Sequence, residues 1–264
     1  MEKYVYAIPS YNRVNRQTTL DYLSKMGVPK EKIWIFTQTE KDLKEYNAAH
    51  GDRANIVMVP ATRGVTARNN ILNWLKDENI LMMDDDVKMI HYMKDGGLVG
   101  FEKRIDLAFA FNRCFDQTRN LRTNIFGIYP VANAFFMSDD VSTRVTVNTI
   151  FGFARNFPQR FDERYETKED AELCGRMLRH GCRVARFNNL AVTADHNKDK
   201  NGYREKWHQD ENLRSVKILC KVYPEIFAPK KGQPWEVRVK IRDEKFQSIP
   251  FKSIQAPQKA VSGG

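Results

Sequence analysis

The stretch Ile80–Ile90, with the sequence ILMMDDDVKMI, places three consecutive acids directly after four apolar residues. The apolar run has the length of a buried strand. Adjacent carboxylates repel one another, and no basic residue lies among Asp84, Asp85 and Asp86. Such a cluster either binds a divalent cation, which prefers oxygen ligands, or forms a solvated acidic turn. The strand favours the cation, because a buried strand delivers the acids to the rim of a sheet.

Strands alternate with helices before this stretch, which predicts βαβ units. The fold class is therefore α/β, with a mostly parallel central sheet and helices on both faces. Ligands bind to such sheets at the carboxyl ends of the strands. The predicted strands are Tyr4–Ile8, Ile33–Phe36, Asn55–Val59 and Ile80–Met83, and the predicted helices are Asn15–Met26, Glu40–Ala49 and Val65–Lys76.

The regular alternation of strands and helices does not continue after Asp86. Two β-like runs flank Pro130 within Asn124–Ser138, and Val141–Ile150 has the alternation of a further strand. We expect a domain over residues 1–228 and a basic extension over residues 229–264, whose end is expected to be disordered. The remaining predicted elements are helices over Glu102–Thr118, Thr167–His180 and Gln209–Val222, and strands over Arg183–Phe187 and Leu190–Ala194.

Length and composition restrict the class of protein. The 264 residues fit one large α/β domain, or one domain with an extension. A hydrophobic content of 42% excludes global disorder. No apolar run approaches the roughly 20 residues that cross a bilayer, and the N-terminus does not resemble a secretory signal. We therefore expect a cytoplasmic protein whose four cysteines are free buried thiols.

The charge of the chain indicates a polyanionic partner. Lysine and arginine number 43 against 33 acids, which gives a formal net charge of +10. Nucleic acid is the leading candidate, because basic side chains gain affinity by displacing its counterions. The alternative is a charged surface without a partner.

The segment Thr62–Asn70, with the sequence TRGVTARNN, has the composition of a phosphate site. Gly64 allows the backbone to approach a ligand, and the following helix offers its N-terminal amides. Arg63 and Arg68 add positive charge. The alternative is an ordinary helix N-terminus with two surface arginines.

Two later segments carry further candidates. Thr167 is a good N-cap residue, and Glu169 and Asp170 follow it in the first turn. Capping alone would explain these acids; the functional alternative makes one of them a general base that points into a cleft. His196 follows a predicted strand and is either a metal ligand or a structural histidine.

In the order of these segments, the chain resembles glycosyltransferases of the GT-A (Rossmann-like) fold, especially the inverting family-2-like group. Asp84–Asp86 is similar to the Asp-x-Asp motif, and Glu169-Asp170 to the Glu-Asp pair of that group. The similarity extends over roughly residues 4–197. The other matching positions are Pro9, Ser10, Tyr11 and Arg13 after the first strand, Arg63, Gly64, Arg68 and Asn69 before the acids, and His196.

The resemblance implies roles for these residues. A divalent metal, Mn2+ or Mg2+, would be held by Asp86, helped by Asp84 and His196, and which two of the three acids ligate stays open. The nucleotide-sugar donor, by family default a UDP-sugar, would be bound by the segments around Ser10 and Arg68 and by Asp84 and Asp85. Asp170 would be the base, with Glu169 beside it, and a single displacement would invert the anomeric carbon.

The acceptor follows from the charge and from a closer resemblance. The chain is similar to the TET-associated glycosyltransferases of bacteriophages, which put sugars on 5-hydroxymethylcytosine in DNA, so the host cytoplasm is the expected compartment. Phe157, Tyr203 and Trp207 are candidates to stack on a displaced base. The candidate DNA contacts are the basic runs Arg113–Arg122, Arg155–Arg164, Lys198–Lys206 and Lys230–Lys245.

Other functions remain as alternatives. A glycosyltransferase that acts on a glycan or surface polysaccharide would share the fold and the catalytic residues. A metal-dependent nuclease could use the same acids with His196 to hold two metals, although the βα order and the Arg63–Asn70 turn argue against it. A nucleic-acid binder without catalysis would explain the charge but not the three acids.

Overall fold

The computed structural model describes residues 2–165, 167–195 and 208–248. Its helices are α1 (Thr18–Lys25), α2 (Glu40–His50), α3 (Gly64–Trp74), α4 (Arg104–Asn120), α5 (Glu169–Arg179) and α6 (His208–Val222), with short 3-10 turns η1 (Lys30–Lys32) and η2 (Ala134–Phe136). Its strands are β1 (Val5–Pro9), β2 (Ile33–Thr37), β3 (Asn55–Met58), β4 (Ile80–Met83), β5 (Val87–Lys94), β6 (Gly97–Gly100), β7 (Ile125–Tyr129), β8 (Asp140–Ser142), β9 (Ile150–Phe153), β10 (Ala185–Ala194), β11 (Phe227–Lys230), β12 (Gln233–Val239) and β13 (Lys245–Gln247).

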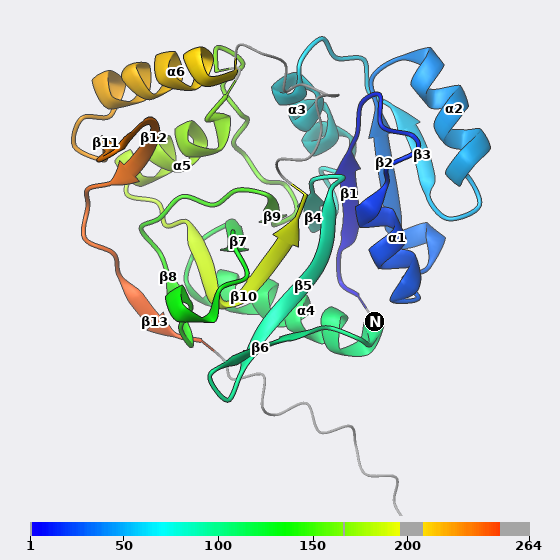
Figure 1. Ribbon diagram of the computed structural model, residues 1–264, viewed down its shortest axis with the longest axis horizontal. Helices are drawn as coiled ribbons and strands as arrows, with labels where there is room; N and C mark the ends of the chain where they lie inside the picture. The colour runs from blue at the N-terminus through cyan, green and yellow to red at the C-terminus, as the bar shows by residue number, and fades with distance from the viewer. Residues whose placement is uncertain (1, 166, 196–207, 249–264) are drawn as a thin grey trace, which may run out of the picture.

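The described strands form an eleven-stranded sheet and a separate β11–β12 hairpin (Figure 1). The order in the large sheet is β13-β8-β10-β7-β9-β4-β1-β2-β3, and the β5–β6 hairpin is attached to β10. The stretch β4-β1-β2-β3 is parallel throughout. This core, with helices on both faces, confirms the predicted α/β fold with its mostly parallel central sheet.

Alternation along β1 shows why the sheet is covered on both faces. Tyr6 and Ile8 pack with α1, α2 and α4 in one apolar cluster, whereas Val5 and Ala7 pack with α3 and α5 in another. The four residues of β4 divide in the same way and are all buried. Burial on both faces explains the uninterrupted apolar run of β4 and confirms its predicted bounds.

Strand β9 closes the far side of β4 in an antiparallel pair, with Ile80 opposite Phe153. The ring of Phe126 on β7 lies directly against Gly152, where an added Cβ would come within 1.9 Å of the ring. Because β7 also pairs antiparallel with β9, β7 runs parallel to β4. The loops after β1, β4 and β7 therefore leave the sheet at the same edge.

Three expectations about the second half were wrong. Val141–Ile150 is not one strand, because the backbone amide of Thr143 bonds to the carbonyl oxygen of Glu244 and the chain then leaves the sheet until β9. The second run near Pro130 is the 3-10 turn η2, which the side chain of Asn133 caps. The two strands predicted over 183–194 are one strand, β10, which changes register between Phe187 and Ala191.

The β5–β6 hairpin was not predicted. Its two-residue turn, Asp95-Gly96, has positive φ at both positions, 51° and 78°. Asp-Gly is a favoured pair for such turns. The hairpin lies across the front of the sheet in Figure 1, and β5 pairs antiparallel with the last residues of β10.

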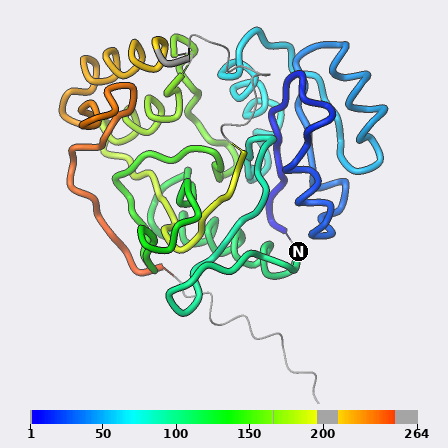
Figure 2. The backbone as a smooth tube through the Cα atoms, viewed as in Figure 1, coloured from blue at the N-terminus to red at the C-terminus, as the bar shows by residue number. Residues whose placement is uncertain are grey.

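The chain after residue 226 packs onto the main body. The predicted boundary at residue 228 falls within β11, and β13 adds to the edge of the large sheet through β8. Figure 2 shows the β11–β12 hairpin beside α5 and α6, where its apolar residues share a small core with both helices. The end that was expected to be disordered lies outside the described residues.

Two expectations concern the whole chain. Among the helices described, none combines the length and the apolar character that crossing a bilayer requires. All four cysteines are free thiols, as predicted, and Cys114 and Cys174 are buried. Cys182 is exposed and Cys220 is half-buried, so for these two the expectation of burial was wrong.

Candidate active site

The loops that follow β1 and β4 meet at the carboxyl edge of the sheet. These strands pair in parallel, with Ala7 opposite Met82, so the residues just beyond them are neighbours. Ser10 donates a hydrogen bond from Oγ to Oδ2 of Asp85 (2.7 Å), and Arg13 donates from Nη1 to Oδ1 of the same carboxylate (2.6 Å). The sequence placed both segments in the donor site, and the structure brings them together.

Asp85 is buried, with 6% of its surface exposed. Burial raises its pKa to about 6, although Arg13 and Ser10 act in the opposite direction. Ser10 also contacts Tyr46 (2.8 Å between the hydroxyl oxygens) and accepts a hydrogen bond from Gln17 (2.8 Å). Both oxygens of Asp85 therefore hold the loop after β1, whose shape this buried network determines.

Tyr46 and Gln17 are site-supporting residues that the sequence did not indicate. Tyr46 lies on α2 and is fully buried, and its hydroxyl also accepts the backbone N–H of Arg13 (3.0 Å). Gln17 donates to the carbonyl oxygen of Arg13 as well (3.0 Å). Pro9 ends β1, and Tyr11 lies at the surface with 36% of its area exposed.

Arg68 connects the acids after β4 with the start of α5. Its Nη2 lies 2.9 Å from Oδ1 of Asp84, and its Nε lies 3.9 Å from Oε1 of Glu169. The guanidinium also lies over the rings of Phe151 (5.6 Å) and Phe161 (5.9 Å). Burial lowers the pKa of Arg68, but the nearby acids outweigh it and the net shift is upward. A permanent cation thus lies between two predicted site acids.

Glu169 and Asp170 are half-buried in the first turn of α5. Burial is the main cause that raises the pKa of both carboxyls, and the neighbouring Asp170 raises the pKa of Glu169 further. Arg68 lowers the pKa of Glu169, and Lys168 lowers that of Asp170. Oδ1 of Asp170 accepts the backbone N–H of Ala171 (2.8 Å). A carboxylate with a raised pKa is a suitable general base.

The expected N-cap of α5 was wrong. The residue before the helix is Lys168, in the left-handed conformation (φ 64°), and its side chain makes no capping hydrogen bond. Thr167 instead donates from its hydroxyl to that of Ser215 on α6 (3.1 Å). The helix therefore begins one residue later than the sequence suggested.

Asp86 lies next to the end of β10. The backbone N–H of Asp195 donates to the carbonyl oxygen of Asp86 (3.1 Å), and Oδ1 of Asp86 is buried. His196, the third predicted metal ligand, lies outside the described residues. Within the described ranges no three His, Cys, Asp or Glu side chains form a metal-binding group. Asp84 and Asp86 offer carboxylate oxygens at this edge, which suits a hard divalent cation as a partial ligand set.

The start of α3 is tied to the loop that follows β9. The side chain of Asn69 accepts the backbone N–H of Phe161 (2.8 Å) and donates to the carbonyl oxygen of the same residue (3.0 Å). It also donates to Oε1 of Glu163 (3.1 Å). Arg63 is exposed at the N-terminus of α3 and donates to the carbonyl oxygen of Glu163 (3.3 Å). Gly64 is the first residue of the helix. Asn69 thus fixes the loop that carries Phe161 beneath Arg68.

The structure describes some of the residues that were predicted to contact DNA. Phe157 is buried and packs on Phe153, with 4.9 Å between ring centroids, so its proposed stacking on a displaced base was wrong. Arg160 bonds to Asn73 (2.8 Å), and Arg164 pairs with Asp162. Lys198–Lys206, Tyr203 and Trp207 lie outside the described residues.

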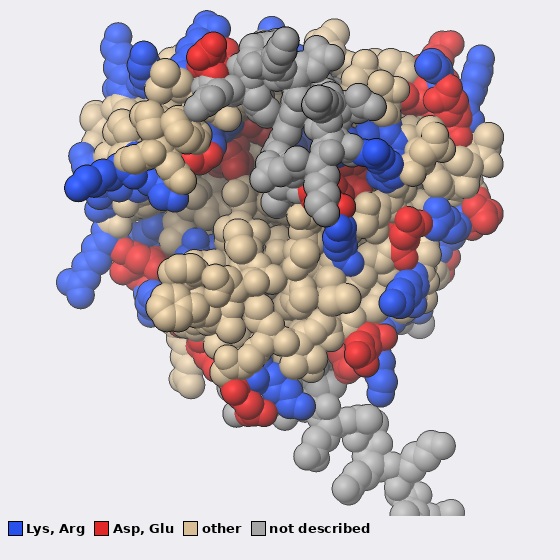
Figure 3. Space-filling view, viewed as in Figure 1, with Lys and Arg blue, Asp and Glu red and all other residues tan. Residues whose placement is uncertain are grey.

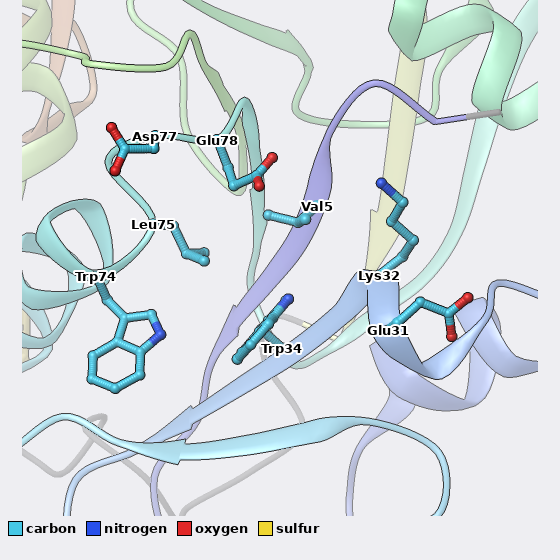
Figure 4. Close-up of a pocket in the computed structure, with 8 residues that line it drawn as sticks. All are labelled: Val5, Glu31, Lys32, Trp34, Trp74, Leu75, Asp77 and Glu78. Atoms are coloured by element: carbon cyan, nitrogen blue, oxygen red, sulfur yellow. The ribbon is translucent and has the colours of Figure 1, made fainter.

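A cavity of about 430 Å³ lies at the opposite edge of the sheet (Figure 4). Val5, Trp34 and Leu75 lie around it, at the start of β1, in β2 and before β4. Since it lies at the amino ends of these strands, no predicted site residue lines it. The space-filling view instead shows a hollow near the carboxyl edge, below the region of α5 and α6 (Figure 3).

Acids and arginines thus meet at the carboxyl edge of a mostly parallel α/β sheet, where ligands bind in such folds. The model of the TET-associated glycosyltransferase family matches residues 4–203. The chain belongs to this family, as the sequence predicted.

Comparisons with other known proteins add only distant similarities. No curated protein sequence matches the chain. The structure of S. aureus TarS 1-349 is similar at 13% identity over 84% of this chain and 65% of that one, with a TM-score of 0.49. The CTP complex of CMP:2-keto-3-deoxy-manno-octonic acid synthetase is similar at 14% identity over 84% of this chain and 99% of that one, with a TM-score of 0.43. The chain spans less than two thirds of either TarS structure (65% and 43%).

Proposed function

We propose that this enzyme transfers a sugar from a nucleotide-sugar, by family default a UDP-sugar, to the hydroxyl group of 5-hydroxymethylcytosine in DNA, with inversion at the anomeric carbon. The observation that carries the proposal is the position of Arg68, between Asp84 at the end of β4 and Glu169 at the start of α5. Arg68 would then lie between the two substrates, with the donor diphosphate beside Asp84 and the acceptor hydroxyl beside Glu169.

Asp170 is the proposed base. Its carboxylate accepts the proton of the acceptor hydroxyl, while the acceptor oxygen forms a bond to the anomeric carbon. The bond between that carbon and the diphosphate oxygen breaks, and the nucleoside diphosphate leaves with the electron pair. The raised pKa of Asp170 supports this role, because a stronger base takes the proton more readily.

The proposed donor site lies at the carboxyl ends of β1 and β4. The leaving diphosphate gains negative charge, and Arg68, Arg13 and Arg63 place positive charge around this edge. The nucleotide base would contact Pro9, Ser10 and Tyr11. Asp85 fixes this loop by accepting a hydrogen bond from Ser10. Asn69 supports this site by fixing the neighbouring loop.

A divalent metal, Mn2+ or Mg2+, is part of the proposal. Asp84 and Asp86 would hold it through their carboxylate oxygens, with His196 as the third proposed ligand. When bound, it would supply positive charge against the diphosphate.

The DNA acceptor is supported by the family and by charge. Basic side chains gather at the left edge of the molecule, near β11 and β12 (Figure 3). Lys230, Lys231 and Arg238 of this hairpin are exposed, and they lie within a basic run that the sequence assigned to DNA. The target nucleobase would have to leave the duplex stack so that its hydroxyl group could reach the carboxylate of Asp170.

A transfer assay tests this function. The enzyme is incubated with Mn2+, a panel of labelled sugar nucleotides, and duplex DNA with or without 5-hydroxymethylcytosine. We expect label only on the modified DNA, and loss of label when a chelator is added. Slow hydrolysis of one donor without label on DNA would instead indicate that the acceptor is a glycan or another molecule. Label on DNA that persists after the chelator is added would contradict the proposed metal requirement.

A further inference from the structure

Lys168, two residues before the proposed base Asp170, has an uncommon backbone conformation. Lys168 has φ 64° and ψ 20°, in the left-handed region, although it is not glycine. Such a conformation persists only where the surroundings determine it. The helix that follows has no side-chain cap to fix its start.

The contact that holds Lys168 comes from the C-terminal hairpin. Its Nζ lies 2.7 Å from Oε2 of Glu236 on β12, and only 16% of the lysine side chain is exposed. Glu236 itself is 40% exposed. The ion pair therefore links the residue before α5 to a strand that lies beyond residue 203, where the family match ends.

The hairpin is fixed firmly against α5. Phe227 of β11 is buried, and an added Cβ at Gly175 of α5 would come within 2.4 Å of its ring. Val237 and Val239, which follow Glu236 in β12, pack into the small core that includes Ala171 of α5. Glu236 thus has a defined position relative to the first turn of α5.

We propose that Glu236 is a positioning residue for the transfer reaction, which holds Lys168 and thereby sets both the place and the charge environment of Asp170. This inference rests on the proposed function, in which Asp170 is the base. Without Glu236, the ammonium group of Lys168 would be uncompensated and would stabilise the ionised form of Asp170 more strongly. A base of lower pKa accepts a proton less readily.

Among the described residues, four charged groups act on Asp170. Lys168 and Arg68 attract its negative charge, and Glu169 and Glu236 repel it. Arg68 lies on α3, Glu236 lies on β12, and the other two belong to the start of α5. Removal of Glu236 and removal of Lys168 should therefore shift the pKa of Asp170 in opposite directions, which a purely structural role would not do.

The experiment measures that pKa directly. The carboxyl of Asp170 is titrated in the full-length protein by infrared difference spectroscopy, with the Asp170→Asn form of each variant as reference. We expect Glu236→Gln to lower the pKa and Lys168→Gln to raise it, each by about half a unit or more. In a plot of kcat against pH, the midpoint of the acidic limb should move in the same direction as the pKa of Asp170. Glu236→Gln should also lower kcat severalfold and change the donor KM little.

Glu225→Gln is the matched control. Glu225 pairs with Arg179 near the other end of α5 (2.7 Å) and is similarly exposed, so its loss should leave the Asp170 titration unchanged. Shifts that are absent, that share one direction, or that the control reproduces would overturn the inference. If Glu236→Gln fails to fold, Glu236→Thr, which suits a strand, is titrated in its place and should show the same downward shift. If wild-type enzyme labels no DNA, the proposed function fails, and the titration still decides the role of Glu236.

Discussion

Ser10 is the residue on which the buried network after β1 converges. Its hydroxyl contacts Asp85, Tyr46 and Gln17, all of which are buried. A buried polar group that loses its partner costs more free energy than an average hydrogen bond contributes. The network therefore makes the shape of the proposed nucleotide loop depend on one small side chain.

Ser10→Ala should lower the free energy of unfolding by about 1–3 kcal/mol, because it leaves three buried polar groups short of a partner. Urea denaturation of both proteins measures the difference. The same substitution at the half-buried Ser24 of α1 is the control and should change stability by less than about 0.5 kcal/mol. Equal effects at the two positions would contradict the importance of the network.

Asp170→Asn should reduce transfer by roughly 10²- to 10⁴-fold, the usual contribution of a general base, and leave donor binding intact. In the wild type, kcat should fall as pH drops, because the protonated carboxyl cannot accept a proton. The midpoint of that fall should lie above the ordinary aspartate pKa, since burial raises it. Rates across pH and donor titration check both points, and full activity of the variant would refute the base assignment.

Individual site residues were predictable to different degrees. Asp84, Arg68 and Glu169 were all indicated by sequence, and the structure brings them together. Phe151 and Phe161, which lie beneath Arg68, were not. Their role depends on contacts between distant segments, and an apolar residue in a strand gives no indication of which cation it will meet.

At the scale of elements, the tight contact between β7 and β9 sets the position of β4. Gly152→Ala should lower the free energy of unfolding by about 1–3 kcal/mol, because the new methyl group overlaps the ring of Phe126. Thermal or urea unfolding measures the change.

Gly97→Ala is the control for this substitution. An added Cβ there lies 3.6 Å from the nearest atom, the carbonyl oxygen of Lys94, which is an ordinary contact. We expect a change within about 0.5 kcal/mol. A loss at Gly97 as large as that at Gly152 would show that overlap with Phe126 is not the cause.

The elements before the acids were predictable, and several after them were not. β4 has its predicted bounds, since periodicity and burial agree there. The β5–β6 hairpin was missed although its Asp95-Gly96 turn is visible in the sequence, because it interrupts the expected strand–helix alternation. β8 was joined to β9 in the prediction because its ends depend on hydrogen bonds to the distant residues Asp243 and Glu244.

For the whole molecule, the net charge of +10 predicts binding to DNA that weakens with salt. Replacing Lys230, Lys231 and Arg238 with glutamine should flatten the plot of log affinity against log salt, by up to about one unit for each phosphate that the protein no longer neutralises. Filter binding at several salt concentrations measures the slope.

The matched variant replaces Lys25, Lys41 and Lys44, which are exposed on α1 and α2 at the other side of the molecule (Figure 1). It removes the same charge and should leave the slope nearly unchanged. Equal slopes for the two triple variants would mean that the β11–β12 hairpin does not contact DNA.

The family match ends at residue 203, whereas the hairpin that reaches Lys168 begins at Phe227. A segment outside the shared region therefore touches the first turn of the proposed catalytic helix. Selection can alter this segment without disturbing β1, β4 or α3, which form the proposed donor site. Chimaeras joined near residue 226 would therefore exchange the surroundings of Asp170 while keeping the proposed donor site unchanged.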